Sequence, residues 1–127
     1  MNEKISEGLN RQFHSSCAML KDAINNVPDD KWHNGTEGWF FSLTAYHIVE
    51  TMDFYTRDYP KGMMWGGKAG FDWDKAKNIE SQVLPKITKD IVSSYLEEME
   101  ERLDIFFETK GVTQLSSTDD FDYGLFR

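Results

Sequence analysis

Three long stretches of this sequence carry apolar residues at intervals of three and four positions. This is the repeat of an α-helix, and it would scatter the same residues over both faces of a β-strand. The first stretch covers residues 3–27, and its apolar positions are Ile5, Leu9, Phe13, Cys17, Leu20, Ile24 and Val27. Pro28, which lacks a backbone N–H, ends it. Since the sequence has no alternating Val- or Ile-rich run, we predict an all-α fold.

The second predicted helix runs from Trp39 or Ser42 to Asp58 and has two apolar stripes. One stripe contains Phe41, Ala45, Ile48, Val49 and Met52, and the nearly opposite one contains Phe40, Leu43, His47, Glu50 and Phe54. A helix that is apolar on two sides packs on two sides. We therefore expect His47 and Glu50 to lie among large apolar side chains. The second stripe also needs a partner that this chain does not obviously supply.

The third predicted helix begins after Thr88, a good N-cap residue, and continues to Thr109. Before it come a Gly-rich connection over residues 61–70 and a short helix over residues 72–83 with Asp72 as its N-cap. The periodicity stops after Gly111. We predict one domain over residues 1–111 and a C-terminal tail over residues 112–127. Three long amphipathic helices indicate a helical bundle whose fourth helix is absent or supplied by a partner.

The composition excludes several classes of function. The 127 residues carry a formal net charge of −8, which disfavours binding to nucleic acids and to anionic membrane surfaces. No run of 18 apolar residues predicts a transmembrane helix, and the first residues lack the apolar core of a signal peptide. A lone cysteine, Cys17, forms no internal disulfide. We expect a cytoplasmic protein with no nucleic-acid or membrane partner.

Residues 62–68 match the G-x-x-x-x-G-K half of a phosphate-binding loop. The next residue is Ala69, so the hydroxyl that would bind magnesium is missing. The segment also follows a predicted helix and Tyr59-Pro60, whereas a phosphate-binding loop follows a buried strand. We interpret this segment as a loop that packs on the end of the bundle.

His47 is the strongest single candidate for a functional residue. A buried imidazole needs a hydrogen-bond partner or a metal, so His47 is either a metal ligand or a core histidine bonded to a carbonyl, a Tyr or Glu50. Glu50 lies one turn further on and is the candidate second ligand or hydrogen-bond partner. We expect His14 at the rim of the first helix, His33 in a solvated turn and Cys17 as a small buried hydrophobe.

The order of these features resembles the DinB-like superfamily. The resemblance covers residues 3–109 and rests on three segments: the aromatic lead Gly38-Trp39-Phe40-Phe41-Ser42, the segment Leu43–Asp58 that contains His47, and the entry to the third helix at residues 87–96. It implies an up-down four-helix bundle, often dimeric, with nickel or zinc bound by three histidines. One of the three stands at the position of His47. The other two come from a His-x-x-x-His pair on the fourth helix, and this sequence contains no such pair.

Two functions therefore stay open. The resemblance implies a divalent-metal-dependent hydrolase or thiol transferase for a small-molecule substrate, with an incomplete metal site in this chain. Such an open site would lower the pKa of a bound water or thiol. The alternative is a non-catalytic helical module for dimerisation or binding. Under either interpretation we expect a homodimer.

Overall fold

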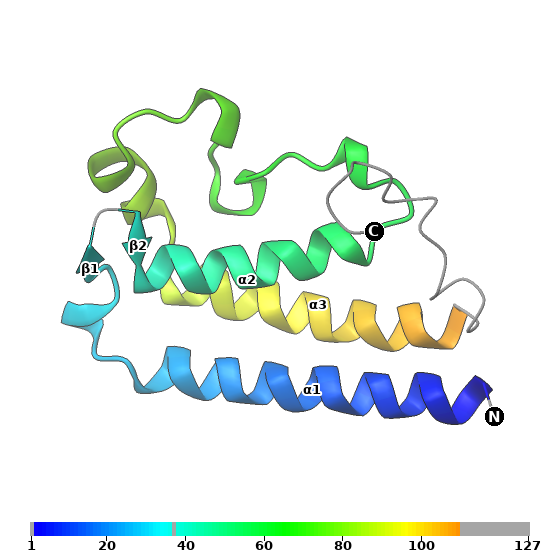
Figure 1. The fold of residues 1–127 in the computed structure, drawn as a ribbon. Helices are drawn as coiled ribbons and strands as arrows, with labels where there is room; N and C mark the ends of the chain where they lie inside the picture. Colours follow the sequence, from blue (N-terminus) through cyan, green and yellow to red (C-terminus); the bar gives the residue numbers. More distant parts are fainter. Residues whose placement is uncertain (1, 37, 110–127) are drawn as a thin grey trace.

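The computed structural model describes residues 2–36 and 38–109, which form a mainly helical fold (Figure 1). Its three long helices are α1 (Asn2–Asn26), α2 (Phe41–Tyr55) and α3 (Lys89–Thr109). These bounds confirm the three helices predicted from the apolar spacing. Thr88 caps α3 as predicted, because its Oγ1 accepts a hydrogen bond from Ile91 N at 3.1 Å. The predicted tail, and any fourth helix within it, lies outside the described residues.

A small hairpin precedes α2 and was not predicted. Its strands, β1 (Gly35–Thr36) and β2 (Trp39–Phe40), pair antiparallel with Gly35 opposite Phe40. Two-residue strands are too short to show an alternating pattern. Gly35 has a φ of 150°, and a Cβ there would lie 2.3 Å from the Trp39 carbonyl oxygen, so the hairpin requires glycine at this position.

Helices α2 and α3 run in the same direction, and α1 runs opposite to both (Figure 1). The helices therefore do not alternate as a simple up-down bundle would. Near the start of both helices, Trp32 Nε1 donates a hydrogen bond to Ile87 O at 2.7 Å. Near their ends, Arg102 donates to the carboxylate of Asp53. Residues 56–88 bring the chain back to the end of the bundle where α2 begins.

The core lies between the three helices. Fully buried side chains come from α1, α2 and α3, among them Ile24, Val49, Leu96 and Met99. None of the helices in residues 2–36 and 38–109 combines the length and apolar character that a membrane span requires.

The connection between α2 and α3 packs along the outer side of α2 (Figure 1). It contains short 3₁₀ turns at Pro60–Gly62, Gly67–Ala69, Trp73–Lys75 and Leu84–Lys86, and a π-helical turn at Ile79–Val83. These turns replace the short helix predicted over residues 72–83. Asp72 nevertheless caps its turn, because its Oδ1 accepts a hydrogen bond from Asp74 N at 3.0 Å.

The connection also covers the second apolar stripe of α2. The Trp65 ring packs against Phe54 with ring centroids 5.3 Å apart, and it lies 6.5 Å from the ring of His47. The expectation that this chain supplies no partner for the stripe is therefore wrong. The segment at residues 62–69 follows no strand and packs as a loop, as predicted, but it lies against the middle of α2 and not on the end of the bundle.

Candidate functional site

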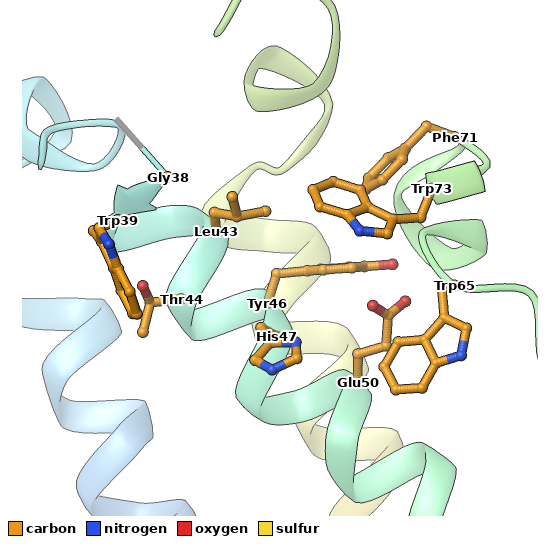
Figure 2. A pocket seen from close by; sticks show the side chains of 10 residues that line it. All are labelled: Gly38, Trp39, Leu43, Thr44, Tyr46, His47, Glu50, Trp65, Phe71 and Trp73. Atoms are coloured by element: carbon orange, nitrogen blue, oxygen red, sulfur yellow. The ribbon is translucent and has the colours of Figure 1, made fainter. Parts of the chain in front are cut away.

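A pocket of about 280 Å³ lies where the hairpin, α2 and the connection meet (Figure 2). The hairpin contributes two lining residues, α2 contributes five and the connection contributes three: Gly38, Trp39, Leu43, Thr44, Tyr46, His47, Glu50, Trp65, Phe71 and Trp73. Because α2 packs on α3 through its other side, a rigid helix holds half of this pocket. Sites on such elements are positioned more accurately than sites built from loops alone.

Aromatic rings form most of the pocket wall. Phe71 lies with its ring centroid 5.5 Å from that of Trp73, and Trp65 lies 6.5 Å from the His47 ring. Trp39 is 76% exposed and Trp73 is 42% exposed, so these two indoles form the rim. The pocket thus opens to solvent between aromatic edges, with the polar side chains of Thr44 and His47 exposed among its lining residues.

The floor contains the carboxylate of Glu50, which is only 6% exposed. Its Oε2 accepts a hydrogen bond from Gly66 N at 2.6 Å. Burial raises the pKa of Glu50, and the hydrogen bond from Gly66 offsets part of that rise. Gly66 is required here because its φ is 92° and a Cβ would lie 2.5 Å from the Phe71 ring. The loop thus brings a backbone N–H onto a buried acid.

Tyr46 places a second polar group beside this carboxylate. Figure 2 shows its hydroxyl pointing to the same space as the carboxylate of Glu50. Tyr46 is 1% exposed, and its Oη is enclosed beside the Glu50 carboxylate and the backbone of residues 68 and 69. Burial, followed by the nearby charge of Glu50, raises the pKa of the hydroxyl. The enclosed hydroxyl acts as a donor toward the carboxylate, which reduces the cost of burying both groups.

The pocket carries one acidic group and no strong base. Glu50 is the only carboxylate among the ten lining residues, and neither Lys nor Arg is among them. Lys68 lies two residues after Gly66 in the sequence, but its Nζ pairs with Glu98 Oε2 on α3 at 2.7 Å. The pocket therefore has a negative floor whenever Glu50 is ionised.

The structure brings the two predicted site residues together, but in different environments. Glu50 is buried as expected, whereas His47 is exposed at the edge of the pocket. Sequence reasoning missed Tyr46, although it lies four residues before Glu50 and so shares its helix face. It also missed Trp65 and Trp73 as lining residues, because no sequence signal places the connection over α2.

The other histidines lie elsewhere. His14 Nε2 lies 2.9 Å from Asp104 Oδ1 between α1 and α3, which agrees with the expected rim position. His33 Nδ1 lies 2.8 Å from the hydroxyl of Ser42, so this turn residue has a side-chain partner as well as solvent. Cys17 is buried as expected.

The described residues do not fit the three-ligand metal centre that the family resemblance implies. His47 and Glu50 line the same pocket, but residues 2–36 and 38–109 contain no group of three or more His, Cys, Asp and Glu side chains arranged to hold a metal ion. Two protein ligands are fewer than the three of an open catalytic zinc site.

A second buried acid, Asp53, lies one turn beyond Glu50 and has a different role. It is 1% exposed and accepts hydrogen bonds from Arg57, just after the end of α2, and from Tyr95 and Arg102 on α3. Burial alone would raise the pKa of Asp53, but these three donors together hold it below its ordinary value. This network joins α2 to α3 and does not line the pocket.

Comparison of the chain with models of known protein families, with curated proteins and with solved structures finds no match. The pocket is therefore the feature from which a function can be proposed.

Proposed function

We propose that this chain is a non-catalytic helical module that binds a small organic molecule in the pocket between the hairpin, α2 and the connection. One observation carries the proposal: an aromatic-walled pocket of about 280 Å³ ends on two buried polar groups, those of Tyr46 and Glu50. Small-molecule sites combine a mostly apolar wall with a few convergent polar groups in this way.

A metal-dependent hydrolase or thiol transferase of the DinB-like type stays a prediction. His47 and Glu50 alone favour a binding role over an open metal centre, since such a centre needs a third ligand. The homodimer also stays a prediction. The connection now covers the helix face that suggested it, so this support for a dimer is gone.

The proposal can be tested with 2-phenylethanol, a soluble one-ring molecule that suits an aromatic-walled pocket. We expect calorimetric titration to show saturable 1:1 binding to the full chain. Leu43→Trp enlarges a pocket-lining side chain and should abolish binding. Ile48→Trp makes a similar change on α2 at a 44% exposed position that does not line the pocket, and it should bind normally. No binding to the unmodified chain, or equal binding by both variants, contradicts the proposal.

Measuring the metal content of the chain distinguishes the proposed binding module from a metal-dependent enzyme. Mass spectrometry of the purified chain and of His47→Ala should show no stoichiometric nickel or zinc in either protein. Near-stoichiometric metal that disappears in His47→Ala would favour the metal-dependent enzyme instead.

A further inference from the structure

The charge of the pocket indicates which class of ligand it takes. An anionic ligand would meet the carboxylate of Glu50 and no Lys or Arg among the lining residues. A cation would be attracted to the same carboxylate, and its charge would offset the cost of burying it. The formal charge of the whole chain, −8, has the sign that attracts a cation from solution.

The hydroxyl of Tyr46 is enclosed beside the carboxylate of Glu50, and the side chain is 1% exposed. Figure 2 shows this hydroxyl and the carboxylate of Glu50 pointing into one space. Glu50 already accepts one hydrogen bond, from Gly66 N. A ligand with several N–H donors could donate to the carboxylate oxygen that Gly66 N does not use, which a neutral hydrocarbon cannot do.

The aromatic side chains favour the same class of ligand. In Figure 2 the ring of Trp73 lies above the Tyr46 hydroxyl and the ring of Trp65 lies beside Glu50. Faces of Trp and Tyr rings attract organic cations, most strongly where water is excluded. The same rings accept the apolar part of a ligand toward the rim, where Trp73 and Trp39 are exposed.

We propose that the ligand of this pocket is a protonated organic amine. Its ammonium group donates hydrogen bonds to the Glu50 carboxylate, and its apolar part lies against Trp65 and Trp73. This inference rests on the proposed small-molecule function and deepens it. Glu50 is the binding residue in this assignment, and Tyr46 is a neutral hydroxyl beside its carboxylate.

The test compares 2-phenylethylamine with 2-phenylethanol by calorimetric titration at neutral pH. The two probes share one ring and one linker and differ in the terminal group, which is a protonated amine in one and a hydroxyl in the other. We expect the amine to bind at least about tenfold more tightly, as one added hydrogen bond to a charged group predicts. This comparison needs only the unmodified chain.

Two charge-matched variants locate the effect. Glu50→Gln keeps an oxygen that can accept from Gly66 N but removes the charge, and it should weaken amine binding about tenfold or more while changing 2-phenylethanol binding less than about twofold. Glu98→Gln removes one negative charge at an exposed pair outside the pocket and should change neither affinity by more than about twofold.

The outcomes separate the two proposals. If 2-phenylethanol binds as tightly as the amine, the pocket is a binding site but the amine assignment is wrong. If the amine binds more tightly and Glu50→Gln, shown by circular dichroism to be folded, does not weaken it, the cation is held elsewhere and the assignment is also wrong. If neither probe binds the unmodified chain, the proposed function itself fails.

Discussion

Removing the charge of Asp53 should be one of the most destabilising single changes that leave the shape of a side chain intact. The carboxylate of Asp53 is 2% exposed and accepts from Arg57 Nε at 2.7 Å and Nη2 at 3.3 Å, as well as from Tyr95 Oη and Arg102 Nη1. Hydrogen bonds to a charged group contribute about 1.5–3 kcal/mol each. In Asp53→Asn these contacts lose the charge, and the amide N–H₂ faces donors rather than acceptors.

Partial exposure of the arginines limits the cost. The side chains of Arg57 and Arg102 are 32% and 29% exposed, so their guanidinium groups regain some hydration in the variant. Tyr95 is 2% exposed, so its hydroxyl does not regain hydration in the variant. We therefore expect Asp53→Asn to lower the free energy of unfolding by about 3 kcal/mol, at the lower end of the range for breaking a buried ion pair. A domain of this size has a total of only about 5–15 kcal/mol.

Urea unfolding followed by circular dichroism measures this loss. With an m-value of about 2 kcal/mol per molar urea, the midpoint should fall by roughly 1.5 M. Glu98→Gln is the matched control, because its partner Lys68 is 43% exposed and Glu98 itself 44%. The control should cost less than about 1 kcal/mol. If Asp53→Asn costs no more than Glu98→Gln, the buried network does not hold α2 to α3 as we argue.

Three further predictions concern the core and the pocket floor. Trp32→Phe leaves the Ile87 carbonyl without its 2.7 Å hydrogen bond and should lower the free energy of unfolding in urea by about 1–3 kcal/mol. A loss below about 0.5 kcal/mol would contradict this prediction. Burial, with a smaller effect of nearby Glu100, raises the pKa of Cys17 to about 11, so the native thiol should resist Ellman's reagent in mildly alkaline buffer and react only in urea; rapid native labelling would contradict this. Gly66→Ala strains a φ of 92° and displaces the Phe71 ring, so it should weaken 2-phenylethanol binding, and unchanged titration isotherms would refute it.

The helices could be predicted from the sequence because their signal is local. Apolar spacing and caps such as Thr88 fixed each long helix within a few residues of its observed bounds. The course of residues 56–88 could not be predicted in this way. It depends on contacts distant in sequence, such as the hydrogen bond from Trp32 to Ile87 and the packing of Phe71 on Tyr46. The pocket wall depends on the same contacts between residues distant in sequence, so only its α2 side could be predicted from the sequence.

The different environments of His47 and Glu50 follow from helix geometry. Residues three apart on an α-helix are separated by about 60° around the axis, so one can face the packed side while the other lies at its edge. The carboxylate of Glu50 turns toward the Gly66 loop, and His47 lies at the exposed edge near Trp65. The sequence pattern placed both residues on one stripe, which was correct, but it did not show where the covering segment ends.

Glu50 and Asp53 lie one turn apart, but we expect them to change the stability of the fold with pH in opposite directions. Burial raises the pKa of Glu50 above its ordinary value of 4.5. The unfolded chain therefore releases this proton at lower pH than the folded chain, and folding loses stability as pH rises from about 4.5 toward the folded pKa of Glu50. Glu50→Gln lacks this proton, so its stability relative to the unmodified chain should increase with pH across that interval and then level off.

The contribution of Asp53 to stability changes with pH in the opposite direction. Its donors Arg57, Tyr95 and Arg102 outweigh burial and hold its pKa below the ordinary value of 3.8, so its contribution is complete above pH 3.8 and is lost as pH falls through the folded pKa. The stability advantage of the unmodified chain over Asp53→Asn should thus shrink only in acid, below the interval in which the Glu50 comparison changes. Urea midpoints measured for both variants from acid to neutral pH test this separation. If the stability of both variants relative to the unmodified chain rose with pH, burial rather than the identity of the hydrogen-bond donors would control both acids.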